Sequence, residues 1–141
     1  MNILLPVDGS DNALRATRFV IGLAKVSAGP VEIHLLTVQP PIISGDVKMF
    51  ISKEDIDGYY RDEGAKALAA ARAELDAAGV SYRHHIGVGH IAETIAAYVK
   101  EKTCDQVVMG TRGMGGFSGM VLGSVATKVV HLVPCPVTLV K

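Results

Sequence analysis

Short apolar runs alternate with helix-like segments along this chain, and that alternation restricts the fold more than any other feature. The runs that read as strands are residues 2–7, 31–38, 80–86, 106–109 and 136–140. The segments between them carry apolar residues at helical spacing. Strands joined by helices form βαβ units, whose right-handed crossovers place helices on both faces of a mostly parallel sheet. The sequence therefore predicts a doubly wound, five-stranded α/β fold.

Length and charge narrow the class of protein. The 141 residues fit one domain covering 1–141, and 14 lysines and arginines balance 14 aspartates and glutamates. A balanced chain has no global field that would draw it to nucleic acid or to an anionic membrane. Asp8 interrupts the first apolar run too early for a signal peptide, and no run is long enough to span a bilayer. We expect a cytoplasmic protein with no nucleic-acid partner and no membrane insertion.

Local signals place the helix ends and the loops. Ser10 can cap a first helix, and Gly79 can end a long helix that runs from about residue 53 to 78. Residues 42–52 show no period and are interpreted as a loop on the ligand side. Cys104 and Cys135 have no metal-binding spacing, so both are interpreted as small core residues.

A glycine-rich stretch follows the fourth strand. Gly110-Thr111-Arg112-Gly113 is separated by nine residues from Gly123-Ser124, and a helical run begins after the serine. Backbone amides approach an anion closely where side chains are absent, and a helix start attracts phosphate. Gly115, Gly116 and Gly119 add to the density of glycines. The alternative is a surface loop whose glycines only form turns. No lysine precedes Ser124, so the stretch is not a Walker A loop.

Asp8 follows the first strand as Gly110 follows the fourth. Ligands of doubly wound sheets bind beyond the carboxyl ends of strands where the strand order reverses, so the two loops form one crevice if these strands are neighbours. Asp8 is then a candidate acid, metal ligand, or acceptor for a base or ribose. Turn and cap chemistry within Asp8-Gly9-Ser10 explains it equally well.

The remaining motifs favour structural roles. The stretch 87–92, Gly-Val-Gly-His-Ile-Ala, resembles a dinucleotide fingerprint but lies in the wrong place, and a tight turn is the preferred interpretation. His84 and His85 are adjacent in a strand and point to opposite faces, so these two and His90 are expected in solvent or core rather than on a metal. No G-x-S-x-G elbow occurs. We predict no catalytic residue and no metal site.

Four separated motifs together resemble the universal stress protein family, in its ATP-binding branch. They are the opening 3–10 (ILLPVDGS), the strand end 36–38 (LTV), the stretch 107–113 (VVMGTRG) with Gly123-Ser124 at its fixed distance, and the close 134–137 (PCPV). The resemblance covers the whole chain in the right order. It implies a parallel sheet of order 3-2-1-4-5 and a homodimer through the last strand, Pro136 to Val140, with higher oligomers left open. An apolar edge strand is a surface that pairing would cover.

The same resemblance implies a ligand and a site. The ligand is ATP, with AMP and ADP as alternatives, together with Mg²⁺. Residues 114–122 carry no lysine or arginine, which weakens the expectation of tight triphosphate binding. The implied site has Pro6, Val7, Asp8 and Val38 at the adenine and ribose, and Gly113, Gly123, Ser124 and Val125 at the phosphates. Gly110 and its neighbours Met109, Thr111 and Arg112 would meet ribose and phosphate, and Gly115 and Gly116 complete the set.

The sequence hypothesis is a nucleotide-responsive regulatory module of the stress response, with slow or no hydrolysis. A protein partner such as a transporter is part of that hypothesis. Two alternatives stay open: a dimeric interaction module of the same fold with an empty loop, and a slow ATPase.

Overall fold

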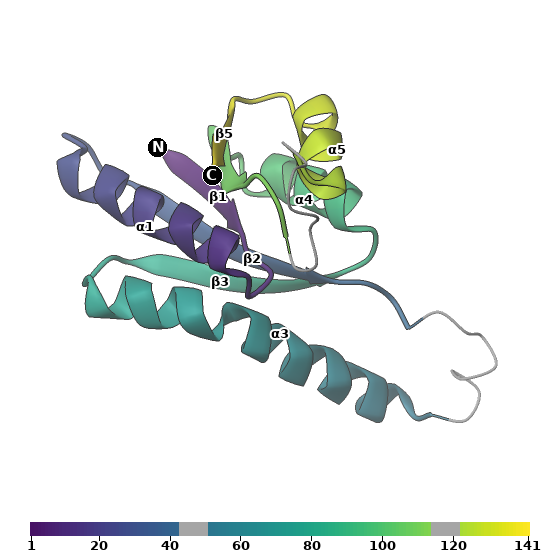
Figure 1. The fold of residues 1–141 in the computed structure, drawn as a ribbon. Helices are drawn as coiled ribbons and strands as arrows, with labels where there is room; N and C mark the ends of the chain where they lie inside the picture. The colour runs from purple at the N-terminus through teal and green to yellow at the C-terminus, as the bar shows by residue number, and fades with distance from the viewer. Residues whose placement is uncertain (43–50, 114–121) are drawn as a thin grey trace.

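The computed structural model describes residues 1–42, 51–113 and 122–141. Five parallel strands form one sheet in the order β3-β2-β1-β4-β5 (Figure 1). They are β1 (Asn2–Pro6), β2 (Glu32–Gln39), β3 (Tyr82–Val88), β4 (Gln106–Gly110) and β5 (Val137–Val140). The predicted fold class and the implied strand order are both confirmed.

Helices cover both faces of the sheet. The helices of the described residues are α1 (Asp11–Val26), α3 (Lys53–Ala77), α4 (Ile91–Glu101) and α5 (Ser124–Leu132). One buried cluster joins α1 and α3 to the sheet, and a second joins α4 and α5 to its other face (Figure 1). No helix of the described segments is long and apolar enough to cross a membrane.

β1 lies at the centre of the sheet and is buried on both faces. Ile3, Leu4 and Leu5 are fully inaccessible to solvent. Ile3 and Leu5 pack with α1 and α3, whereas Leu4 packs on the side of α4 and α5. Successive side chains of a strand point to opposite faces, so a strand covered on both sides must be apolar throughout. This requirement explains the unbroken apolar run at the start of the sequence.

The predicted cap of α1 is present. The Ala13 amide donates to Ser10 Oγ at 3.1 Å, which satisfies one of the free amides of the first turn. Ser52 caps α3 in the same way, through the Asp55 amide at 3.1 Å. The buried face of α3 includes Gly64 and Leu68.

The end of α3 explains why β3 begins later than the sequence pattern indicates. Gly79 has a φ of +69°, and the Val80 amide donates to the Leu75 carbonyl at 3.1 Å. A left-handed glycine followed by this backward bond is a Schellman motif. Val80 therefore closes the helix, and β3 starts at Tyr82 rather than at residue 80.

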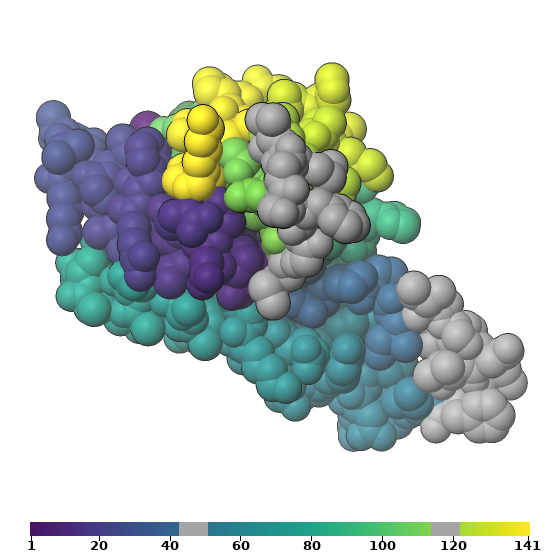
Figure 2. Space-filling view, in the orientation of Figure 1, coloured from purple at the N-terminus to yellow at the C-terminus, as the bar shows by residue number. Residues whose placement is uncertain are grey.

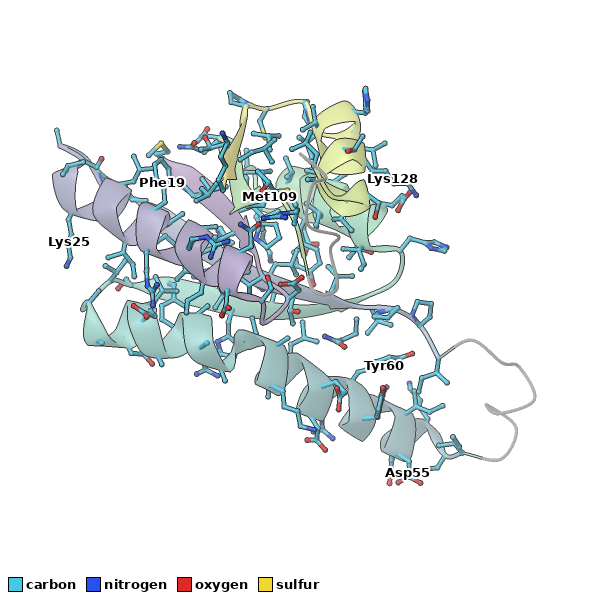
Figure 3. All side chains as sticks on the ribbon, viewed as in Figure 1. Phe19, Lys25, Asp55, Tyr60, Met109 and Lys128 are labelled. Carbon is cyan, nitrogen blue, oxygen red and sulfur yellow. The ribbon has the colours of Figure 1, made fainter. Side chains whose placement is uncertain are left out.

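The predicted loop at residues 42–52 falls mostly outside the described residues, which omit 43–50. Its two described ends are held near α3. The Ile42 amide donates to the hydroxyl of Tyr60 at 2.8 Å (Figure 3), and Ser52 is the cap of the helix.

Candidate functional site

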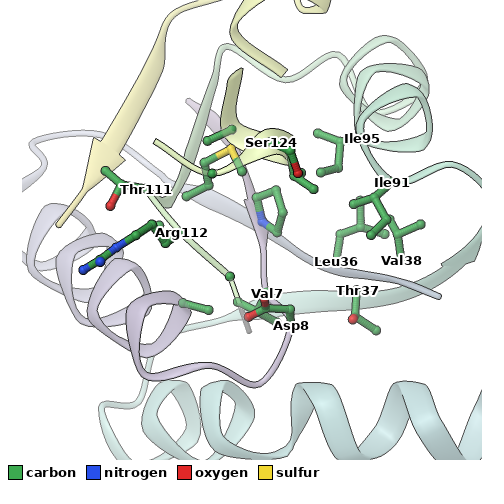
Figure 4. Close-up of a pocket in the computed structure, with 18 of the residues that line it drawn as sticks. Val7, Asp8, Leu36, Thr37, Val38, Ile91, Ile95, Thr111, Arg112 and Ser124 are labelled. Atoms are coloured by element: carbon green, nitrogen blue, oxygen red, sulfur yellow. The ribbon is translucent and has the colours of Figure 1, made fainter. Parts of the chain in front are cut away.

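A cleft of about 610 Å³ opens beyond the carboxyl ends of β1, β2 and β4 (Figure 4). β1 lies between β2 and β4, so the connections that leave β1 and β4 run to opposite sides of the sheet. Loops that diverge at such a reversal leave a crevice between them. The starts of α4 and α5 complete the walls, through Ile91 and Ser124.

The structure brings together every predicted site residue that it describes. All twelve line the cleft: Pro6, Val7, Asp8, Val38, Met109, Gly110, Thr111, Arg112, Gly113, Gly123, Ser124 and Val125. The other two, Gly115 and Gly116, lie outside the described residues. Segments more than 100 residues apart in the sequence thus share one cavity because their strands are neighbours in the sheet.

Gly113 and Gly123 stand where the cleft wall leaves little room for a side chain. A Cβ on Gly113 would lie 2.5 Å from Asp8 Oδ2. A Cβ on Gly123 would lie 3.3 Å from the Thr111 carbonyl oxygen, and the Gly123 amide donates to that oxygen at 2.6 Å. Glycine therefore keeps bare backbone on this wall of the cleft, where a ligand can approach it closely.

The start of α5 forms one end of the cleft, and its free amides have the geometry that favours an anion. Gly123 precedes the helix and has no side chain with which to cap it. The first intrahelical hydrogen bond of α5 runs from the Thr127 amide to the Gly123 carbonyl at 3.1 Å. The amides of residues 124–126 come before it and therefore have no partner within the helix. These amides and the helix dipole favour a negative group beside the exposed Ser124 hydroxyl (Figure 4).

The opposite end of the cleft is apolar. Val38, Ile91 and Ile95 face one another there (Figure 4). The two isoleucines are not among the site residues predicted from the sequence. Apolar residues at i and i+4 indicate one face of a helix and nothing more. The pairing of β2 with β3 and the turn after β3 place the start of α4 beside the cleft. The other lining residues that sequence reasoning missed are Ala13, Leu36, Thr37, Gln39, Pro40 and Ala126.

The charges at the rim are few. Asp8 Oδ1 accepts from the Ser10 amide at 3.0 Å, so the predicted turn chemistry is present even though Asp8 also lines the cleft. The Arg112 side chain leads away from Ile91 and Thr37, toward α1 (Figure 4). Among the described residues no group of three or more His, Cys, Asp or Glu side chains could hold a metal ion.

The histidines expected in solvent or core divide between these environments. His84 and His90 are exposed, whereas His85 is half-buried and lies 3.1 Å from the ring of His34. The turn interpretation of residues 87–92 fits the geometry, because Gly89 has a φ of +151° and its amide donates to the Gln39 carbonyl at 3.0 Å. The pairing of His34 with His85 depends on the register of β2 and β3 and was not predicted from the sequence.

The fold and the cleft together define a doubly wound α/β protein with a ligand crevice at the reversal of its strand order. The family follows from comparison with known sequences. A family model described as the universal stress protein family matches residues 1–141. The chain belongs to the universal stress protein family.

Relatives and solved structures agree with this assignment. Universal stress protein MJ0531 of Methanocaldococcus jannaschii is 33% identical over 140 residues, which cover 99% of this chain and 81% of the relative. The structure of UspA from Lactobacillus plantarum is similar in fold, with a TM-score of 0.83, 24% identity, and coverage of 100% of this chain and 97% of the other.

Some similar structures contain adenine nucleotides. A universal stress protein in complex with cAMP is 25% identical, with a TM-score of 0.73 and coverage of 100% of this chain and 97% of the other. The Archaeoglobus fulgidus protein in complex with dAMP has 24% identity, a TM-score of 0.72 and coverage of 100% and 98%. The Arabidopsis thaliana protein with AMP bound has 23% identity, a TM-score of 0.69 and coverage of 100% and 91%; these last two show the shared fold.

Proposed function

We propose that this chain binds an adenine nucleotide in the cleft and acts in the cytoplasm as a nucleotide-responsive regulatory module of the stress response. The observation that carries the proposal is the division of one cleft into two ends. Bare glycine backbone and the start of α5 form one end, and an apolar slot forms the other. A nucleotide has the same two parts, a flat apolar base and an anionic phosphate.

The geometry suggests how the nucleotide would lie. The base would enter the slot beside Val7, Val38 and Ile91, and the phosphates would meet Gly113, Gly123 and the first amides of α5. The ribose would lie between them, near Asp8 and Gly110. The bound cAMP of a 25% identical structure supports this class of ligand.

ATP is the proposed physiological ligand, and AMP and ADP are the alternatives to test beside it. Mg²⁺ would arrive as the counter-ion of the phosphates, because the described residues offer no protein cage for it. Mg²⁺ often binds in this way, through phosphates, waters and one or two carboxylates. No described side chain stands out as a base that could orient water, so we propose binding with slow hydrolysis or none.

Calorimetric titration of nucleotide-stripped protein with Mg-ATP, ADP and AMP tests the proposal. We expect saturable binding near one site per chain. Gly123→Val should weaken that binding about tenfold or more, because the valine side chain would occupy space where the phosphates approach the backbone. Gly22→Ala is the matched control, since a Cβ there meets nothing within 4 Å. Absence of heat with all three nucleotides would reject nucleotide binding and favour the interaction module.

Dimerisation through Pro136 to Val140 is a further part of the proposal. β5 is the last strand of the sheet, and its four residues are all half-buried. The carbonyls of Pro136 and Val140 accept from Val107 and Thr111 of the β4 segment, so by alternation the Leu139 amide faces outward. Pairing with a second copy would cover that edge, and a partner protein such as a transporter could then recognise the dimer.

Sedimentation velocity tests the dimer. Leu139→Pro removes an outward N–H, and Leu139→Ala is the control that loses the same packing but keeps the donor. We expect dissociation in the proline variant and not in the alanine variant. A wild-type protein that sediments as a monomer at all concentrations would overturn this part.

A further inference from the structure

Asn12 bonds to two segments that lie far from it in the sequence, the residues after β4 and the end of β5. It lies in the first turn of α1 and is 6% exposed. Its Oδ1 accepts from the Arg112 amide at 2.8 Å, and its Nδ2 donates to the Val140 carbonyl at 3.2 Å. Figure 2 shows the start of α1 (purple), the residues after β4 (green) and the end of the chain (yellow) gathered on one face.

Backbone hydrogen bonds extend this connection to the end of the cleft at the start of α5. The Gly123 amide donates to the Thr111 carbonyl at 2.6 Å, and the Thr111 amide donates to the Val140 carbonyl at 3.0 Å. The Val140 oxygen thus accepts from both Thr111 and Asn12. A short chain of hydrogen bonds therefore runs from the start of α5, past Thr111 and Arg112, to the last residue of the edge strand.

The packing of Asn12 leaves little room for independent movement. A Cβ on Gly110 would overlap Asn12 Oδ1, would lie 2.8 Å from Asn12 Cγ and would lie 3.1 Å from the Asn12 backbone carbonyl carbon. A buried amide group that loses its hydrogen-bond partners is destabilising, because its desolvation is then uncompensated. A shift of the Arg112 backbone would therefore move the Asn12 amide group with it, and Val140 would follow.

We propose that Asn12 is a positioning residue that couples occupancy of the cleft to the outer edge strand β5. The proposed function supplies the input: a phosphate held by Gly113 and the start of α5 fixes the backbone at Thr111 and Arg112. The Thr111 amide restrains the Val140 carbonyl directly, and Asn12 adds a side-chain route from Arg112 to the same carbonyl. Val140 ends β5, whose neighbour among the described strands is β4. The result is a change in the local stability of β5, the edge strand that would pair with a second copy. Coupling of this kind is a shared free energy between two sites.

Hydrogen–deuterium exchange with and without saturating Mg-ATP tests the coupling. In the wild type we expect exchange at residues 137–140 to slow about fivefold or more on binding. Asn12→Asp keeps an oxygen for the Arg112 amide but sets an oxygen against the Val140 carbonyl. In the Asn12→Asp variant, nucleotide should still protect residues 111–113 from exchange, while the slowing of exchange in β5 is lost. Arg15→Gln is the matched control, since it removes another bond from α1 to the C-terminus, Arg15 Nε to Lys141 O at 2.9 Å.

A second arm needs no nucleotide and separates the two proposals. Gly123→Ala places a Cβ 3.3 Å from the Thr111 carbonyl oxygen and so disturbs the chain of bonds from the cleft side. We expect this variant to change β5 exchange in the wild-type background. In an Asn12→Ala background the direct Thr111–Val140 bond remains but the side-chain route is gone, so the change should fall to about half or less. Equal effects in both backgrounds overturn the coupling, whether or not the protein binds nucleotide. Absence of ATP binding together with unequal effects rejects the proposed function and keeps the coupling.

Nucleotide binding that leaves wild-type β5 exchange unchanged also overturns the proposal. A β5 response that is the same in wild type, Asn12→Asp and Arg15→Gln does so as well. In that case Asn12 only stabilises the fold.

Discussion

The side-chain oxygen of Asn12 occupies the place where residue 110 would carry a Cβ, so α1 approaches the end of β4 this closely because residue 110 is glycine. Gly110 is itself buried. The glycine therefore has a packing role in addition to its place in the cleft. The same side chain then reaches Arg112 and Val140, which makes this contact a junction between the cleft and the edge of the sheet.

Gly110→Ala should destabilise the protein by about 1–3 kcal/mol, because the new methyl group has no space beside Asn12. Urea unfolding followed by circular dichroism measures the change. Gly22→Ala, at an open position inside α1, should be neutral or stabilising by up to about 1 kcal/mol. Equal stability of the Gly110→Ala variant and the wild type would show that α1 can move away at no cost.

Gly64 and Ile86 form a second close contact, between α3 and β3. A Cβ on Gly64 would lie 2.7 Å from both Cδ1 and Cγ2 of Ile86. Gly64→Ala alone should therefore cost about 1–3 kcal/mol. In an Ile86→Ala background the clash is gone, and the same change should stabilise by about 0.5–1 kcal/mol because alanine favours the helix. A double-mutant cycle by thermal unfolding checks this change of sign, and additive effects would contradict it.

Sequence patterns predict the elements of this fold well because each pattern reflects a local requirement. The buried β1 must be apolar on both faces, and α1 needs Ser10 at its start. Contacts that depend on register are different. His34 meets His85 only because β2 and β3 pair in one particular register, and neither segment carries a signal of that register by itself.

The candidate site was predictable in part for the same reason. Its glycines and Asp8 come from motifs, and the sheet order brings their strands together. Ile91 and Ile95 lie four residues apart on α4, a spacing that indicates one face of a helix and not the cavity that this face meets. Asn12 is a single polar residue in the first turn of α1, and its two hydrogen bonds span 100 and 128 residues of sequence. Such long-range partners follow from the assembled fold and not from the local sequence.

The His34–His85 pair should make the protein less stable in mild acid. Burial lowers the pKa of both imidazoles from 6.5, and Lys102 lowers both further. At His34, Arg83 also lowers the pKa, and Glu32 raises it. At His85, His84 also lowers the pKa, and Glu101 raises it. The folded state then binds fewer protons than the unfolded state between the lowered pKa and 6.5. Stability should be fully present above 6.5 and should fall as the pH drops below it.

Urea unfolding at pH 5 to 8 measures this pH dependence. The hydrogen bond of 3.1 Å between the two rings needs one nitrogen as acceptor, so protonation of both rings removes it. His85→Gln should flatten the loss of stability below pH 6.5, and His131→Gln, at an exposed position on α5, is the control. A wild-type stability that stays constant over this range would contradict the prediction.

Cys104 should react slowly with thiol reagents while the protein is folded. Burial, and after it the neighbouring Cys135, raises the pKa of the Cys104 thiol from 9.0 to about 11, and the residue is 8% exposed. The thiolate is the reactive form, so at pH 8 a shift of this size lowers the reactive fraction about 100-fold. In a Cys135→Ala variant, which leaves one cysteine, labelling by a disulfide reagent should be at least about 100-fold slower in buffer than in denaturant. Similar rates in the two conditions would mean that the turn between α4 and β4 opens often enough to expose the thiol, which would contradict the tight packing of Cys104 against α4 and β4.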